Sequence, residues 1–239
     1  MNGLTRCCLS FILLNCFSFI TNRHLKLFHS LREPFNALSH LLGVFLAVTA
    51  LILLLNRYEP AVTPAHVIAF IIFAIAQVLM FSASTIYHSV PVQDSKLVVL
   101  RKIDHIMIFV SIAGSYTPIC LITLKGGWGT SLLVIVWLIA IAGLFIKIFW
   151  LHAPRKLYTA IYLSMGWLVI VAIYPLYTNL PGGGWIWLGF EALFYTVGAV
   201  IYAMKKPDPL SGTIGFHGIF HIFILLGAIS HFLLLYFYI

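Results

Sequence analysis

The sequence predicts an all-α integral membrane protein, folded as a seven-transmembrane helix bundle, and two observations carry this prediction. Hydrophobic residues make up 62% of the chain and charged residues only 8%, whereas soluble domains average roughly 45–50% and 25%. The apolar residues also gather in long runs, such as 35–55 and 185–204, which approach the ~20 residues needed to cross a hydrocarbon layer of ~30 Å. A soluble core could not absorb such runs, so we expect them to span a membrane.

Seven apolar segments follow one another along the chain, and helix-breaking residues separate them. We expect the segments at about 35–55, 65–87, 103–124, 129–149, 157–177, 185–204 and 214–238. In chain order, the connections contain Pro60 and Pro64, Pro91, Gly126 and Gly127, Pro154, Pro181 with Gly182 to Gly184, and Pro207 with Pro209. Pro118 and Pro175 instead fall inside segments, where each should kink its helix and free a carbonyl group.

Residues 1–32 are expected to form a separate N-terminal tail, and residues 33–239 the seven-helix domain. The tail holds an apolar run between Arg6 and Arg23 that is a little short to cross the membrane. A signal peptide is one interpretation, although no small-residue cleavage pattern follows the run. An interfacial helix is favoured, and an eighth span stays open.

Lysine and arginine gather on one side of the predicted bundle. Together with the tail, that side holds twelve of the 14 basic residues, and only Arg57 and Lys125 lie on the other. The positive-inside rule places the richer side in the cytoplasm, so we expect the N-terminus inside and the C-terminus outside the cell membrane. The formal net charge of +8 then follows from topology, and it gives no support to nucleic-acid binding.

Polar residues recur at one depth, at the cytoplasmic ends of three segments. Ser84 and His88 are four residues apart at the end of the second segment, and Asp104 opens the third. His217 and His221 repeat the four-residue spacing at the start of the seventh segment, and residues four apart share one face of a helix. An ionisable group at membrane depth costs about 2.5–3.5 kcal/mol, so it is usually paired in the bundle interior. We therefore expect these five side chains to meet.

A catalytic zinc ion typically has three protein ligands, such as three imidazoles, and a fourth position open to water. His88, His217 and His221 are therefore predicted metal ligands. Zinc lowers the pKa of a bound water to about 7. Asp104 would orient that water or act as general base, and Ser84 would hydrogen-bond the water or a substrate carbonyl. Such chemistry inside a lipid-facing bundle favours hydrolysis of a lipid, most naturally an amide or ester near the headgroup.

Simpler interpretations stand beside this one, because a lone histidine near a helix end is usually a satisfied interfacial residue and the chain contains 10 histidines. His231 lies some 15 Å beyond His221, at 1.5 Å per residue, so it cannot share the ion, and we expect a buried hydrogen bond there. Glu191, toward the opposite face, is expected to be structural. Lys147, near a helix end, is expected to extend its ammonium group to the membrane surface.

Several short motifs repeat these positions in a recognisable order. They are Glu33-x-x-Asn36-x-x-Ser39-His40, Ser84-x-x-x-His88, Ile103-Asp104-His105, the run from Ala113 to Pro118, and His217-x-x-x-His221 followed by His231. From about Glu33 to the C-terminus, the chain resembles the hemolysin III family, the bacterial branch of the progestin and adipoQ receptor (PAQR) group.

That resemblance implies seven helices with the N-terminus inside, zinc held by His88, His217 and His221, and Asp104 in contact with the zinc through water. Ser84 is implied to lie beside them. The apolar tail departs from the family pattern. Alkaline ceramidases belong to the same wider superfamily, so the resemblance is compatible with an enzyme but does not decide the activity.

Two functions of different classes therefore stay open. One is a zinc-dependent hydrolase of a ceramide-like lipid amide. The other is a non-enzymatic protein, either membrane-lytic or a receptor-like sensor, in which zinc is structural. The segments are apolar nearly throughout, which argues against a wide channel. A retinal protein would need a buried lysine in its seventh helix, and the sequence has no lysine after Lys206. A proton or ion carrier is a further, weaker alternative.

Overall fold

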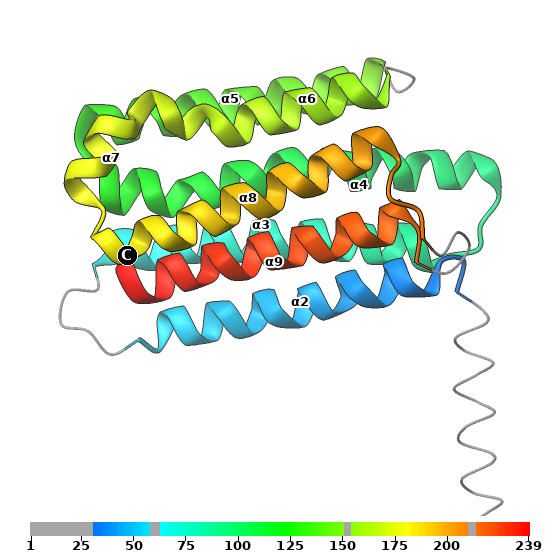
Figure 1. Cartoon of the computed structure of the whole chain (residues 1–239), viewed down its shortest axis with the longest axis horizontal. Helices are drawn as coiled ribbons and strands as arrows, with labels where there is room; N and C mark the ends of the chain where they lie inside the picture. The colour runs from blue at the N-terminus through cyan, green and yellow to red at the C-terminus, as the bar shows by residue number, and fades with distance from the viewer. Residues whose placement is uncertain (1–30, 58–62, 151–153, 210–213) are drawn as a thin grey trace, which may run out of the picture.

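The computed structural model describes residues 31–57, 63–150, 154–209 and 214–239 (Figure 1). The predicted N-terminal tail lies almost entirely outside these residues. Within them, seven helices are long and apolar enough to cross a membrane. The predicted fold class, a seven-helix membrane bundle, is therefore confirmed.

Two of the seven spans are built from more than one helical piece. In chain order, the pieces are α2 (Pro34–Leu55), α3 (Pro64–Ser89), α4 (Asp94–Pro118), η1 (Ile119–Leu124), α5 (Gly126–Phe149), α6 (Arg155–Gly166), η2 (Trp167–Ala172), α7 (Ile173–Asn179), α8 (Gly182–Met204) and α9 (Phe216–Tyr238). The π-helical turn η1 completes the span that α4 begins, and the 3₁₀ turn η2 joins α6 to α7 within one span.

The third span begins earlier than its apolar run. We expected it to start near residue 103, with Asp104 at its opening, but α4 starts at Asp94. That expectation is wrong because an apolar run marks only the part of a helix that lies in hydrocarbon. The polar stretch after Asp94 is also helical, with that carboxylate in the first turn, where the helix dipole favours it. Asp104 consequently lies inside the helix.

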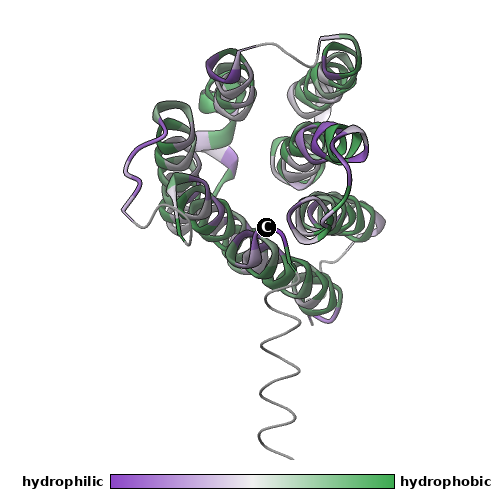
Figure 2. Cartoon of the chain, turned by 90° about the vertical axis from the view of Figure 1, so that its right-hand side faces the viewer, coloured by the Kyte–Doolittle hydropathy of each residue, from purple (hydrophilic) through white to green (hydrophobic). Residues whose placement is uncertain are grey.

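The first and last spans pack against each other and close the bundle. The helices run side by side along one direction, as Figure 1 shows from the side and Figure 2 nearly end-on. Along the chain, α2 packs on α3, α3 on α4 and α4 on α5, while α9 packs on both α8 and α2. The start of α2 is thereby brought beside the start of α9, although about 180 residues separate them.

Small residues allow the helices to approach closely, as expected where lipid gives no hydrophobic drive for association. A Cβ added at Gly114 of α4 would collide with the side chain of Ala76 on α3. A Cβ at Gly129 of α5 would collide with the backbone carbonyl of Cys120 in η1. Both glycines are therefore required by the packing of α4 and η1 against their neighbours.

Both internal prolines lie next to irregular helix, as the sequence predicts. The π-helical turn η1 begins directly after Pro118, and η2 ends three residues before Pro175. Because 3₁₀ geometry interrupts the regular α ladder, backbone groups around η2 need other partners.

Tyr116 supplies those partners from the neighbouring helix α4. Its hydroxyl lies 2.6 Å from the carbonyl oxygen of Gly166 and 3.0 Å from that of Met165, and it accepts a hydrogen bond of 2.9 Å from the backbone N–H of Val169. The side chain is only 6% exposed. Tyr116 therefore holds the broken span to α4 at membrane depth.

We predict that Tyr116→Phe lowers the free energy of unfolding by about 1–3 kcal/mol, because buried backbone groups at η2 lose their partner. Thermal unfolding of the detergent-purified protein would show a reduced midpoint. The matched control is Tyr177→Phe, on a side chain that is 73% exposed, which should leave the midpoint unchanged. Equal midpoints for the wild type and Tyr116→Phe would contradict this role.

Candidate metal centre

Three histidines converge where the end of α3 meets the start of α9. Nε2 of His217 lies 3.3 Å from Nε2 of His88 and 3.1 Å from Nε2 of His221. One ring nitrogen from each of the three lies within 4.8 Å of the other two, so the group could hold a metal ion. The structure thus brings together the three histidines that the sequence singles out as ligands.

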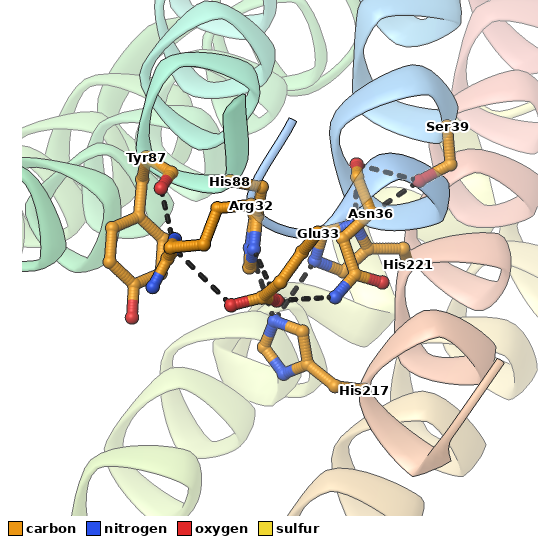
Figure 3. A network of polar contacts seen from close by, with 8 residues as sticks. All are labelled: Arg32, Glu33, Asn36, Ser39, Tyr87, His88, His217 and His221. Carbon is orange, nitrogen blue, oxygen red and sulfur yellow. Dashed lines mark hydrogen bonds and ion pairs between the residues drawn. The ribbon is translucent and has the colours of Figure 1, made fainter. Parts of the chain in front are cut away.

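The outward ring nitrogens of two of these histidines have partners from the start of α2 (Figure 3). Nδ1 of His88 lies 2.8 Å from Oε2 of Glu33. Nδ1 of His221 lies 3.2 Å from Oγ of Ser39 and 3.3 Å from the backbone oxygen of Asn36. A metal-binding histidine commonly donates its second ring N–H to a carboxylate or a carbonyl in this way.

These contacts fix which nitrogens face the centre. When Nδ1 of His88 donates to Glu33 and Nδ1 of His221 donates to Asn36, each neutral ring presents an Nε2 lone pair toward His217. Facing lone pairs repel, so either Nε2 of His217 carries its ring proton and donates it to a neighbour, or a cation lies between the three nitrogens. The arrangement could therefore hold a metal ion.

Glu33 is positioned by backbone pairing as well as by side chains. Its N–H donates to the carbonyl of His88 at 3.0 Å, which ties the start of α2 to the end of α3. Its carboxylate accepts a hydrogen bond of 2.7 Å from Asn36 and lies 3.3 Å from the guanidinium of Arg32. Burial acts to raise the pKa of Glu33, but the hydrogen bonds to His88 and Asn36, together with the charges of His88 and Arg32, outweigh it and lower the pKa to about 2. The carboxylate is therefore ionised beside His88.

His40 lies behind this centre and is not one of the grouped ligands. Its ring stacks on that of His221, with the centroids 3.6 Å apart and the planes at 13°, and only 3% of the residue is exposed. Among the described residues, neither of its ring nitrogens has a hydrogen-bond partner. Stacking restricts the orientation of the His221 ring, which is a role that the sequence did not indicate.

Asp104 and Ser84 line the same cavity as the three histidines. Asp104 is 8% and Ser84 is 2% exposed, and the Ser84 hydroxyl lies near the carboxylate. The cavity has a volume of about 1030 Å³ and extends from Glu33 and His88 to Trp185 in α8. All five side chains expected to meet thus border one space, although Asp104 reaches it from within α4 rather than from a helix start.

Two further expectations have opposite outcomes. Lys147 does not reach the membrane surface: it is 2% exposed, its ammonium lies 3.3 Å from the ring centroid of Tyr158, and it lines the cavity. That expectation is wrong because the cavity and the aromatic ring offer the ammonium a nearer environment than the headgroups. His231 does form the expected buried hydrogen bond, with Glu191 as its partner at 2.9 Å.

Sequence reasoning assigned no role to Glu33, Asn36 or Ser39 beyond their motif. Their spacing of three residues was visible and places them on one face of a helix. Their partners were not visible, because His88 and His221 lie on other helices.

Comparison with known proteins gives consistent matches along nearly the whole chain. A family model described as "Haemolysin-III related" matches residues 28–232. Hemolysin-3 of Bacillus cereus is 38% identical over 209 residues, which cover 87% of this chain and 91% of that protein. A Hemolysin-3 homolog of Bacillus subtilis is 39% identical over 207 residues, covering 86% and 93% respectively.

We predict that the detergent-purified protein carries close to one metal ion per chain by mass spectrometry, and that replacing His88, His217 and His221 together by alanine removes it. Glu33→Gln should weaken metal affinity by about 10–100-fold, because the carboxylate no longer orients His88. Competition with a chelator would measure that change.

Asp94→Asn is the matched control for this measurement, since Asp94 is an exposed acid on α4 that lies outside the cavity lining. It should bind metal as the wild type does. A folded wild type without stoichiometric metal would contradict the metal centre itself, and unchanged affinity in Glu33→Gln would contradict the role of the carboxylate.

Proposed function

This chain belongs to the haemolysin III family of multi-pass membrane proteins, and on that premise we propose that it is a zinc-dependent hydrolase of a lipid amide. The observation that carries the proposal is the position of the three histidines at one end of a large cavity, with Asp104 and Ser84 beside them. An ordinary structural metal site would need neither the spare carboxylate nor the open space.

Zinc fits this donor set. Three neutral imidazoles suit zinc and leave its fourth position open. Two nitrogens that are each 2.0–2.1 Å from zinc at a tetrahedral angle lie about 3.3–3.4 Å apart. The separations of 3.3 Å between His88 and His217 and 3.1 Å between His217 and His221 agree with that geometry.

When bound, zinc would lower the pKa of a coordinated water toward 7. The protein's own groups perform the rest of the proposed chemistry. Asp104 orients the attacking water, accepts its proton as general base and returns that proton to the amine nitrogen as the C–N bond breaks, with the Ser84 hydroxyl beside the carboxylate. Both groups are buried, so bulk water competes little for them.

The cavity supports a lipid as the substrate. Away from the histidines, its lining is mainly apolar and aromatic, with contributions from α4, α6, α8 and α9. Such a surface accommodates a hydrocarbon chain while the polar head lies against the histidines. An amide or ester near the head of a long-chain lipid, ceramide-like in kind, would then reach Asp104.

The orientation in the membrane belongs to the same proposal. The positive-inside rule places the N-terminus and the histidine cluster on the cytoplasmic side, with the C-terminus outside. The reaction would therefore use lipid from the cytoplasmic leaflet.

A second candidate is a membrane-lytic protein with a structural metal, because the two Bacillus relatives are named Hemolysin-3 and a Hemolysin-3 homolog. In that case the metal would stabilise the junction of α2, α3 and α9, and Asp104 would have no chemical role. Metal removal would then unfold the bundle, while Asp104→Asn would leave lysis of erythrocytes or liposomes intact.

We predict that Asp104→Asn lowers the release of fatty acid from a long-chain amide in liposomes by about 10²–10⁴-fold, the usual contribution of a general base. Its metal content should stay at the wild-type level, which separates loss of chemistry from loss of the site. His221→Ala should lose both activity and metal. Asp94→Asn should behave as the wild type in both assays, and a metal-loaded wild type that hydrolyses no member of a broad lipid panel would exclude the hydrolase.

Orientation has a separate test in intact cells, using a variant in which the native cysteines are replaced by alanine. A cysteine introduced as Lys125→Cys should react with a membrane-impermeant thiol reagent, because Lys125 lies in the connection assigned to the outside. One introduced as Lys96→Cys should react only after permeabilisation. The reverse pattern of labelling would invert the proposed topology.

A further inference from the structure

A second polar pair lies in the membrane interior, away from the metal centre. Glu191 of α8 and His231 of α9 both line the cavity and contact each other there, with Nδ1 of His231 2.9 Å from Oε2 of the carboxylate. The side chain of His231 is 1% exposed and that of Glu191 is 13% exposed. Ionisable groups at this depth are costly and mark functional positions by default, yet the proposed hydrolysis uses neither of them.

The histidine of this pair is fully enclosed. Its ring lies 4.9 Å from that of Phe73, and among the described residues its Nε2 has no hydrogen-bond partner and is shielded from solvent. The ring is thus held with Nδ1 toward Glu191. With the proton on Nδ1, His231 donates to Oε2 and fixes the carboxylate.

The carboxylate of Glu191, by contrast, has one oxygen that can still accept a hydrogen bond from a molecule in the cavity. Glu191 lines the cavity and is the more exposed member of the pair. The hydrogen bonds of the described residues occupy Oε2 and give Oε1 no donor. An ionised carboxylate can only accept hydrogen bonds, and leaving such an acceptor unpaired in an apolar space is unfavourable. A water molecule or a polar group that enters the cavity can therefore supply the donor.

We propose that Glu191, held by His231, is a second binding subsite that accepts a hydrogen bond from a hydroxyl group on the hydrocarbon chain of the lipid. A hydroxyl fits better than an ammonium, because an ammonium carries three N–H donors. Of the lining residues within one turn of Glu191 on α8, Leu188 and Ala192 offer no side-chain acceptor, and Tyr195 offers a single hydroxyl. The inference rests on the proposed function in one respect, namely that the lipid occupies the cavity with its polar head at the histidines and its hydrocarbon chain toward Glu191.

The length of α9 sets where that hydroxyl must lie. His231 is ten residues beyond His221, which corresponds to about 15 Å along the helix and to roughly a dozen carbons of an extended chain. A hydroxyl close to the head would remain near the metal centre and miss Glu191. The subsite therefore selects for position on the chain as well as for polarity.

The test is the binding of three fatty acids to the metal-loaded protein in detergent, measured by calorimetry. The acids are octadecanoic acid and its derivatives hydroxylated at the twelfth carbon and at the second carbon. The acid hydroxylated at the twelfth carbon should bind about tenfold more tightly than octadecanoic acid, a ratio equivalent to about 1.4 kcal/mol. The acid hydroxylated at the second carbon should show no such gain.

The variant that removes the subsite replaces both partners, Glu191→Met together with His231→Phe. Replacing a buried pair by apolar residues of similar size is often neutral for stability, whereas removing one partner strands the other. This double variant should fold, bind octadecanoic acid as the wild type does, and lose the preference for the hydroxylated chain. Ser115→Ala, which removes another hydroxyl from the cavity lining, should keep that preference.

Equal binding of octadecanoic acid and the acid hydroxylated at the twelfth carbon by the wild type would overturn the inference, since water alone would then satisfy Glu191. A preference that survives the double variant, or that disappears in Ser115→Ala, would also overturn it, as would failure of every acid to bind. The hydrolase is judged by its own readout. If the protein cleaves lipid amides but does not prefer the acid hydroxylated at the twelfth carbon, only the subsite is excluded. If it shows that preference but cleaves no lipid amide, only the hydrolase is excluded.

Discussion

The hydrocarbon layer offers no water to polar groups, and the described part of this protein is organised by that constraint. Backbone groups around η2 are satisfied by the Tyr116 hydroxyl, and Nδ1 of His231 by Glu191. The three converging histidines turn their Nε2 atoms toward one another, which leaves those of His88 and His221 as acceptors when each Nδ1 donates to α2. A proton on Nε2 of His217 or the proposed cation would satisfy them, so the candidate site follows from the same rule that shapes the bundle.

The sequence predicted the number and order of the spans because a membrane imposes a length and a composition on each of them. It did not predict that a helix extends beyond its apolar run, as α4 does by beginning at Asp94. It also failed for Lys147, since the expectation that a long side chain reaches the headgroups assumes no nearer polar space. The cavity and Tyr158 provide such a space, and both arise only when separate helices pack.

For the candidate site, the sequence supplied residues with repeating spacing within one helix, namely Ser84 with His88 and His217 with His221. It could not supply the partner of His88, because Glu33 lies 55 residues away and pairs with it only through the junction of α2 and α3. The Glu191 and His231 pair was missed for the same reason, since each residue taken alone had an ordinary structural interpretation. Spacing reports a shared face, whereas pairing between helices depends on how the bundle closes.

Closure of the bundle by α9 also has a consequence for how the protein is made. The candidate metal centre takes two of its histidines from α9, the last described span to be synthesised, so no partly inserted chain holds all three histidines. In the proposed function, metal capture would follow the entry of this final span and its packing near α3 and α2. Incorporation of the ion would then be a late maturation step that distinguishes a completely assembled bundle from a stalled one.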